Sequence, residues 1–508
     1  MVTSHDFEPA YTANYRSATA PDVRHKVEAL IRNEIVEDRY RVVQTKPLIT
    51  SALGAVPKSD GGLRLIHDGS RPIGAALNDY AILESQRFQS LDDAVSLLSR
   101  NAFLAKVDLK SAYRAVRVHP DDWQACGLQW TFEGDTQPTY LIDTCLPFGS
   151  RLAPGIFNRL TQAVRRIMRR RGFEVIAYLD DFLVVERSHE RCMQAVNELI
   201  KLLRSLGFSI AWNKVAGPSH KLVFLGVQID TEAGCLELPP DKLSEFHSLV
   251  KDTLLLKRIS LRQLQVLAGK LNWAAGVVSG GRAYLRRVLD AMIPLRASRH
   301  KSRLSQGLKD DLLWWDRFLH VFNGKYWLHC SHQWVHVYVD ASKVGGGMVW
   351  NDEWYYVHWE SDLPQVADAH INVKETVVIA LAIRRWASRW KGCNVIVHSD
   401  NVTALAALNK GSSKNSLAMH AVREIFWLST LYSINVRGVH VPGSSNVAAD
   451  AVSRLHQPVA WPRLEACFGH VTDAGLLVWP WLVLCHMSYK SFVFLFPQAL
   501  RWIRSRRS

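Results

Sequence analysis

Two adjacent aspartates, Asp180 and Asp181, interrupt an apolar stretch at residues 173–185 that is rich in β-branched and aromatic side chains. This pattern predicts a β-hairpin with the two acids at its tip. A carboxylate pair is costly among apolar neighbours unless a positive group binds there, so the pair indicates a cation site. Hard oxygen ligands favour Mg²⁺ or Mn²⁺. Taken alone, an Asp-Asp pair is as typical of a turn or a solvated strand edge as it is of a cation site.

A third acid, Asp108, ends a short apolar stretch that begins at Phe103 and is predicted to be a strand. Carboxylates at neighbouring strand ends can hold two cations about 3.5–4 Å apart, which is the arrangement used for phosphoryl transfer. One metal then activates the attacking hydroxyl and the other stabilises the leaving group. We therefore expect Asp108, Asp180 and Asp181 to bind metal together.

The residues around these acids resemble the motifs of reverse transcriptases. Residues 178–181, Tyr-Leu-Asp-Asp, are similar to the Tyr-x-Asp-Asp box of that family, and Asp108 stands where the family has its first catalytic Asp. Other segments match in the family's order: residues 63–73 resemble the fingers segment, 146–157 the segment beside the nucleotide, and 224–226 the primer grip. The resemblance implies a right-hand polymerase with fingers, palm and thumb.

The same resemblance implies a nucleotide pocket. It places Tyr113 as the aromatic gate that excludes a ribose 2′-hydroxyl, and Arg64, together with Lys58, as the cations that hold the triphosphate. Phe148 and Gly149 lie in the segment beside the sugar. Lentiviral enzymes carry Gln at the position of Phe148, so we expect the contacts to the sugar to differ.

A second set of acids follows along the chain. Asp340 and Asp400 each end a predicted strand, while Glu375 and Asp450 lie on predicted helices. This order resembles ribonuclease H of the retroelement type, and implies an α/β domain with a mixed sheet in which four acids hold two metals that activate water. His440, ten residues before Asp450, corresponds to a histidine that assists product release. The alternative for His440 is a strand histidine with no catalytic task.

Composition is consistent with a nucleic-acid partner. The 508 residues include 62 Lys and Arg against 47 Asp and Glu, so the formal net charge of +15 favours a polyanion. The eight cysteines form no Cys-x-x-Cys pair, which argues against a zinc knuckle and favours a reducing, intracellular setting. The N-terminus has no apolar signal core.

We expect an α+β multidomain chain in which a right-hand polymerase precedes an α/β ribonuclease H-like domain. The predicted parts are a lead-in at 1–22, fingers elements at 23–100, a palm at 101–235, a helical thumb or connection at 236–328, a ribonuclease H-like domain at 329–456, and an apolar and basic tail at 457–508. Pro480 and Lys490 interrupt the tail before the roughly 20 apolar residues of a membrane helix are reached. A docked or poorly ordered tail is therefore favoured over a membrane span.

The combined resemblance implies an RNA-directed DNA polymerase of a retrotransposon, Ty3/gypsy-like to DIRS-like, with ribonuclease H activity. The implied partners are an RNA template, a DNA primer, an RNA–DNA hybrid and deoxynucleoside triphosphates, with two Mg²⁺ or Mn²⁺ ions per active site. The setting would be cytoplasm or nucleus, without stable membrane association. A decayed or domesticated nucleic-acid-binding protein and a noncatalytic scaffold subunit stay open as alternatives, as does a homodimer.

Overall fold

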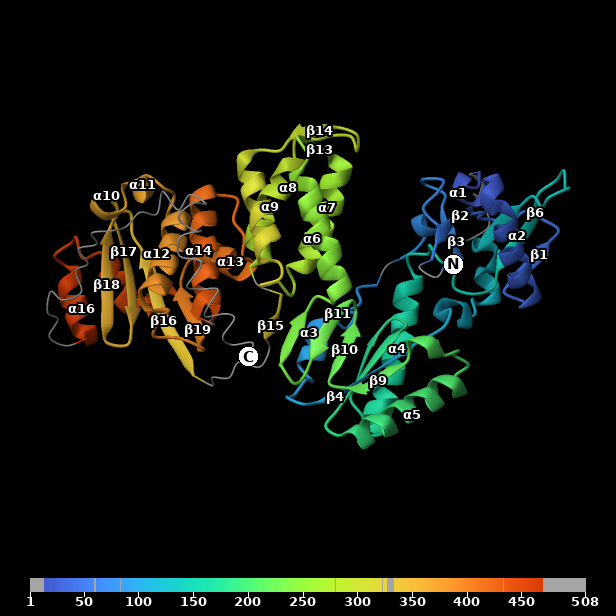
Figure 1. The fold of residues 1–508 in the computed structure, drawn as a ribbon, viewed down its shortest axis with the longest axis horizontal. Helices are drawn as coiled ribbons and strands as arrows, with labels where there is room; N and C mark the ends of the chain where they lie inside the picture. The colour runs from blue at the N-terminus through green and yellow to red at the C-terminus, as the bar shows by residue number, and fades with distance from the viewer. Residues whose placement is uncertain are drawn as a thin grey trace. The chain divides into compact units, whose positions relative to one another are not determined.

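The computed structural model describes residues 13–58, 61–82, 84–278, 280–321, 323–326, 333–432 and 434–468. The chain divides into two compact units (Figure 1), one of Met1–Leu225 with Ile229–Ala233 and one of Gly226–Gln228 with Gly234–Ser508. Both units contain helices and sheets. The prediction of a mixed α and β multidomain chain is confirmed.

The first unit begins with a small sheet and a hairpin that share one core. The sheet has the order β1-β6-β5, with all neighbours antiparallel, and the hairpin joins β2 to β3. The elements are α1 (Arg16–Thr19), α2 (Pro21–Val36), β1 (Tyr40–Val43), β2 (Ala52–Pro57), β3 (Leu63–Asp68), β5 (Gly127–Trp130) and β6 (Thr139–Asp143). Their core includes Val27, Ile31, Leu53, Leu128 and Leu141.

This arrangement differs from the predicted boundaries in two places. Helical structure begins with α1, inside the segment 1–22 that we expected to be a loose lead-in. Strands β5 and β6 belong to the predicted palm segment 101–235, yet β6 pairs along its length with β1, from Tyr40 opposite Asp143 to Val43 opposite Tyr140. The pairing buries apolar residues from distant parts of the sequence, which no local pattern reveals.

The second sheet of this unit positions the first set of acids. Its order is β7-β8-β4-β9, with neighbouring strands antiparallel. The strands are β4 (Phe103–Asp108), β7 (Val175–Tyr178), β8 (Asp181–Glu186) and β9 (Ala216–Ser219), and helices α4 (Ala153–Arg170) and α5 (His189–Ser205) pack on them. Residues 182–185 of β8 are all buried, which is why this stretch is apolar throughout rather than alternating.

The second unit starts with a helical part. It contains β12 (Cys235–Glu237), α6 (Pro240–Leu254), β13 (Arg258–Ser260), α7 (Leu261–Ala274), α8 (Arg286–Met292), β14 (Lys301–Arg303), α9 (Gln306–Phe318) and β15 (Lys325–Tyr326). Helix α7 lies within the segment 236–328 that was expected to be helical. Ser260 caps it and shares a capping box with Gln263, which satisfies backbone N–H groups of the first turn. The short antiparallel pair β13–β14 was not predicted.

A five-stranded mixed sheet follows, with the order β18-β17-β16-β19-β20. The first three strands are antiparallel neighbours, and β16, β19 and β20 run parallel. The elements are β16 (Trp334–Ala341), β17 (Gly345–Trp350), β18 (Glu353–His358), α12 (Ile371–Trp386), β19 (Asn394–Ser399), α13 (Val402–Lys410), α14 (Ser416–Tyr432), β20 (Asn435–His440), α15 (Val447–Ser453) and α16 (Ala460–Phe468).

Helices cover both faces of this sheet. Val337 and Val339 of β16 pack in one core with α12, whereas Tyr338 packs in another core with α15 and α16. Since successive strand residues point to opposite faces, α12 and α15 lie on opposite sides of β16. Twelve of the sixteen residues of α12 are buried, because this helix packs against both the sheet and α14.

The predicted tail 457–508 is structured at its start, where α16 buries Ala460 and Leu464 against the sheet. The remainder of the predicted tail, residues 469–508, lies outside the described residues. In the ranges that the structure describes, we find no helix that combines the length and the apolar character needed to span a membrane.

The close packing of α15 on β17 leads to a stability prediction. A Cβ on Gly347 would lie 2.5 Å from the Ser453 backbone nitrogen and 2.6 Å from the Ala449 carbonyl oxygen. We expect Gly347→Ala to lower the melting temperature of the second unit by about 2–10 °C, because overpacking costs about 1–3 kcal/mol. Gly269→Ala is the control, since no atom lies within 4 Å of its Cβ and Ala favours a helix. A Gly347→Ala protein that melts with the wild type would contradict the packing described.

Candidate metal centres

The first acidic centre forms where β4, β7 and β8 end. Asp108 is the last residue of β4 and pairs in register with Asp181, the first residue of β8. Asp180 lies in the tight turn between β7 and β8, beside Leu179, whose φ is +51°. The predicted hairpin is therefore confirmed, with both acids at its tip. All three carboxylates line one open cleft of about 560 Å³.

A lysine that sequence analysis missed lies between two of these acids. The Lys106 ammonium is 3.3 Å from Asp108 Oδ2 and 3.3 Å from Asp181 Oδ1. Lys214 stands further off, with its Nζ 3.8 Å from Asp108 Oδ2. Lys106 precedes Asp108 by two residues on the same strand, so the alternation of strand side chains could have placed it on the same face.

The Asp108 carboxyl is buried beside a second carboxylate, and both circumstances disfavour its charged form. Burial raises the pKa of Asp108 to about 7, and the hydrogen bond and charge of Asp181 act in the same direction, against the opposing charge of Lys106. Carboxylate oxygens crowded at the edge of a water-filled cleft are a fitting ligand set for a divalent cation.

An aromatic cluster lies close to this centre: burial raises the pKa of Tyr113, and the charge of the nearby Asp180 acts in the same direction. The ring of Tyr113 lies 5.2 Å from that of Phe148 and 5.3 Å from that of Phe157, measured between centroids. The Arg64 guanidinium lies 5.0 Å from the Phe148 ring centroid. The structure therefore gathers three of the predicted nucleotide-pocket residues. Lys58 is exposed at the β2–β3 hairpin, where its N–H donates to the Gly62 carbonyl at 2.8 Å.

Gly149 has a structural reason in this pocket. The His67 N–H donates to the Phe148 carbonyl at 2.7 Å, which joins the loop to β3. A Cβ on Gly149 would lie 1.7 Å from the His67 carbonyl oxygen, and Gly149 has a φ of +122°. Only glycine permits so close an approach of the two backbones.

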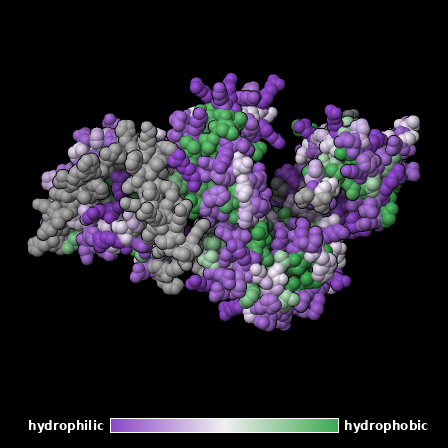
Figure 2. Space-filling view, in the orientation of Figure 1, coloured by the Kyte–Doolittle hydropathy of each residue, from purple (hydrophilic) through white to green (hydrophobic). Residues whose placement is uncertain are grey.

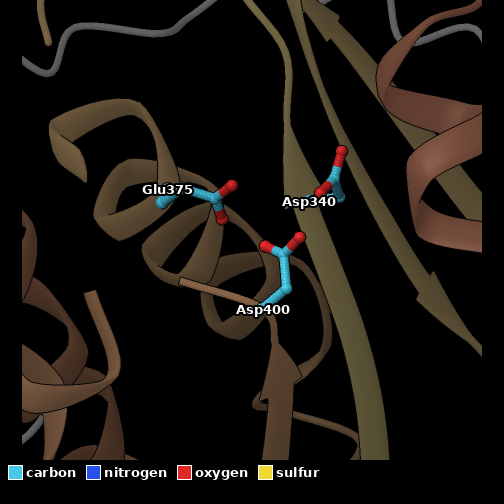
Figure 3. A group of neighbouring side chains, drawn as sticks. All are labelled: Asp340, Glu375 and Asp400. Atoms are coloured by element: carbon cyan, nitrogen blue, oxygen red, sulfur yellow. The ribbon is translucent and has the colours of Figure 1, made fainter. Parts of the chain in front are cut away.

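The second acidic centre joins three elements of the mixed sheet. Asp340 lies on β16, Glu375 on α12, and Asp400 directly after β19 (Figure 3). One ligand oxygen from each lies within 4.8 Å of the others. Within the ranges described, no other trio of His, Cys, Asp or Glu is gathered this closely, including Asp108, Asp180 and Asp181.

Hydrogen bonds hold two of these carboxylates, those of Glu375 and Asp340, in place. Glu375 accepts from the Ala341 N–H at 3.1 Å and from the Ser399 hydroxyl at 3.4 Å, and the Ser453 hydroxyl donates to Asp340 at 2.6 Å. Sequence analysis had assigned Ser399 and Ser453 no role, because each contributes only through a contact that the fold creates.

Burial and mutual repulsion make this centre receptive to a cation. Burial raises the pKa of Glu375 to about 8, and the charge of Asp340 adds to the effect. Burial raises the pKa of Asp340 to about 6, with Asp400 and Asp450 acting the same way against the Ser453 hydrogen bond. Three hard oxygen donors that repel one another fit a Mg²⁺ or Mn²⁺ ion.

The last two predicted residues lie at the edge of this centre. Asp450, on α15, is not part of the group formed by Asp340, Glu375 and Asp400. It forms ion pairs with Arg454 and Arg463. His440 is exposed and ends β20, in register with Ser399. His440 is thus a strand residue opposite Ser399, the residue that precedes Asp400. Its catalytic role stays a prediction.

Comparison with known proteins agrees with these motifs. Residues 56–229 match the family described as reverse transcriptase (RNA-dependent DNA polymerase). The chain is 27% identical over 241 residues to the Retrovirus-related Pol polyprotein from transposon 412 of Drosophila melanogaster, covering 47% of this chain and 18% of that polyprotein. It is 23% identical over 401 residues to the Enzymatic polyprotein of Cauliflower mosaic virus (strain CM-1841), covering 75% of this chain and 54% of the polyprotein. The chain thus spans about half, or less, of these relatives.

Solved structures of similar fold include a foamy viral protease-reverse transcriptase. Its complex with an RNA/DNA hybrid superposes with a TM-score of 0.55 at 16% identity, covering 87% of this chain and 56% of that one. Its complex with dsDNA gives a TM-score of 0.54 at 16% identity, covering 87% and 86%. At this identity the likeness concerns the fold.

The position of Lys106 predicts competition with metal. In an Asp400→Asn background, which disables the second centre, we expect Lys106→Met to gain about 2–4 °C more stabilisation from saturating Mn²⁺ than the parent, because the ammonium no longer occupies the same oxygens. Differential scanning calorimetry with and without Mn²⁺ measures this difference. Lys201→Met, at an exposed lysine paired with Glu198, is the control. Equal Mn²⁺ shifts in all three proteins would contradict the competition.

Proposed function

We propose, from the match of residues 56–229 to the reverse transcriptase family and from the similarity of the chain to a retrotransposon Pol polyprotein, that the chain is an RNA-directed DNA polymerase with ribonuclease H activity. The observation that carries the proposal is the register of Asp108 with Asp181 at the tip of a Tyr-Leu-Asp-Asp hairpin, within a cleft. The element would be Ty3/gypsy-like to DIRS-like.

The first unit would supply fingers and palm. The β1-β6-β5 sheet and the β2–β3 hairpin correspond to fingers, the β7-β8-β4-β9 sheet to the palm, and helices α6 to α9 of the second unit to a thumb or connection. Asp108, Asp180 and Asp181 would hold two divalent cations, which when bound activate the primer hydroxyl and stabilise the leaving pyrophosphate.

The chain's own side chains would select and hold the nucleotide. Arg64, and Lys58 from the same hairpin, would neutralise triphosphate charge. Tyr113 would block a 2′-hydroxyl, and its packing between Phe148 and Phe157 supports this role, because a ring held on two sides cannot turn away from the sugar.

The second acidic centre would cleave the RNA strand of the hybrid that polymerisation leaves. The mixed sheet and the close approach of Asp340, Glu375 and Asp400 support a ribonuclease H-like domain. Asp450 would be its fourth acid, and His440 would assist product release. Buried carboxyls that lie close together and have raised pKa values are what a cation-dependent hydrolase requires.

The distribution of charge supports a nucleic-acid partner. Residues 257–309 contain twelve Lys and Arg and one acid, Asp290, so this short segment carries +11 of the chain's +15. Lys257, Arg258, Arg303 and Lys309 line a cleft at the β13–β14 end of the helical part, where Figure 2 shows a hydrophilic surface, and in the portion of the chain that is described they form no salt bridge. An RNA template, a DNA primer and their hybrid would bring the phosphates that such a surface binds.

Reciprocal substitutions separate the two activities. We expect Asp180→Asn to lower primer extension on an RNA template more than about 100-fold while hybrid cleavage persists, and Asp400→Asn to do the reverse, because even outer-shell partners of a metal are worth 10–100-fold. Each variant is the matched control for the other. Full extension by Asp180→Asn would refute the polymerase assignment, and full cleavage by Asp400→Asn would refute the nuclease assignment.

The gate assignment predicts a change in sugar selection. Tyr113→Val should raise ribonucleotide incorporation relative to deoxynucleotide incorporation by about 10- to 200-fold, the range that steric discrimination in a pocket supplies. Single-nucleotide extension kinetics with paired ribo- and deoxyribonucleotides give the ratio. Tyr140→Val, on β6, is the control. An unchanged ratio would show that another side chain selects the sugar.

A further inference from the structure

The fourth acid of the second centre is held by two arginines. Arg454 Nε lies 2.7 Å from Asp450 Oδ1, and Arg463 Nη1 lies 3.0 Å from Asp450 Oδ2. Each carboxylate oxygen therefore has its own guanidinium. Asp340, Glu375 and Asp400 meet within 4.8 Å of one another without Asp450.

The two arginines reach Asp450 in different ways. Arg454 follows Asp450 by four residues and is a local partner at the end of α15. Arg463 comes from a separate helix, α16, which packs on α15 through buried Ala460 and Leu464. Trp461 of α16 packs edge-on against Trp354 of β18, with 6.2 Å between the ring centroids. The docking of α16 thus fixes where Arg463 stands.

A guanidinium and a divalent cation compete for the same carboxylate lone pairs. The Ser453 hydroxyl lies 2.6 Å from Asp340 Oδ2 and 2.9 Å from the Asp450 carbonyl oxygen, so Asp450 borders the centre. Both arginines are partly exposed, at 43% and 49% of the side chain, and solvent screens such pairs. A metal ion can therefore displace a guanidinium from Asp450. The affinity of the centre for the metal is then lowered, because the ion pair must be broken first.

We propose that α16 is a latch on the second acidic centre: Arg463 holds the Asp450 carboxylate and competes with the divalent cation for it, so that docking of α16 sets the metal affinity of the centre. The inference rests on the proposed nuclease centre and adds its regulation. Arg463 is a positioning residue, since it acts through Asp450. Release of α16 would remove one of the two guanidiniums that hold Asp450 and leave only the local, partly exposed Arg454 to compete with the cation.

Manganese binding tests the latch independently of catalysis. The full chain carrying Asp108→Asn, Asp180→Asn and Asp181→Asn retains only the second centre, and isothermal titration with Mn²⁺ gives its Kd. We expect Arg463→Ala to lower this Kd about three- to tenfold. Arg389→Ala is the matched control, because Arg389 is 52% exposed and pairs with Glu353 in the same sheet domain. Arg463→Lys, which keeps the charge, should stay closer to the parent.

The outcomes separate the latch from the function on which it rests. If Arg463→Ala binds Mn²⁺ within twofold of Arg389→Ala, the latch is wrong while the metal centre stands. If the Arg463→Ala gain persists when Asp450→Asn is added, the arginine does not act through Asp450 and the latch is again wrong. If adding Asp400→Asn to the parent causes no loss of Mn²⁺ binding, the nuclease proposal itself fails. Comparing melting temperatures of Arg463→Ala and Arg463→Lys with the parent verifies that both variants are folded.

Discussion

Repulsion between carboxylates gathered at strand ends is the constraint on which both centres depend. Asp108 and Asp181 lie side by side, and the Lys106 ammonium, 3.3 Å from an oxygen of each, offsets part of their charge. Burial and neighbouring carboxylates raise the pKa of Asp108 in the first centre and of Asp340 and Glu375 in the second. In each centre the carboxylates repel one another, and a bound divalent cation would offset this repulsion.

The two sheets create this repulsion in the same way. In each sheet a buried strand carries an acid at or near its end, and a neighbouring element carries a second acid beside it. Strand β8 places Asp181 beside β4, and helix α12 places Glu375 beside β16. The apolar cores on which these strands pack fix the carboxylates where they would otherwise move apart. The cation binding that we propose would therefore depend on the scaffold as much as on the acids.

Sequence pattern predicted the elements that are locally encoded. The hairpin at Asp180, the strand ending in Asp108 and the helix bearing Glu375 follow from apolar runs and helical spacing. Features that depend on distant chain segments could not be predicted: the pairing of β6 with β1, the approach of Gly149 to His67, and the contact of Arg463 with Asp450. Lys106 was within reach, because strand alternation alone places it on the face of Asp108.

Anomalous diffraction from crystals grown with Mn²⁺ and an RNA–DNA hybrid tests the central claim most directly. The account predicts manganese peaks within coordination distance of Asp108 with Asp180 or Asp181, and of Asp340 with Glu375 and Asp400. A structure that contains the bound hybrid but no manganese at either group of acids would contradict it.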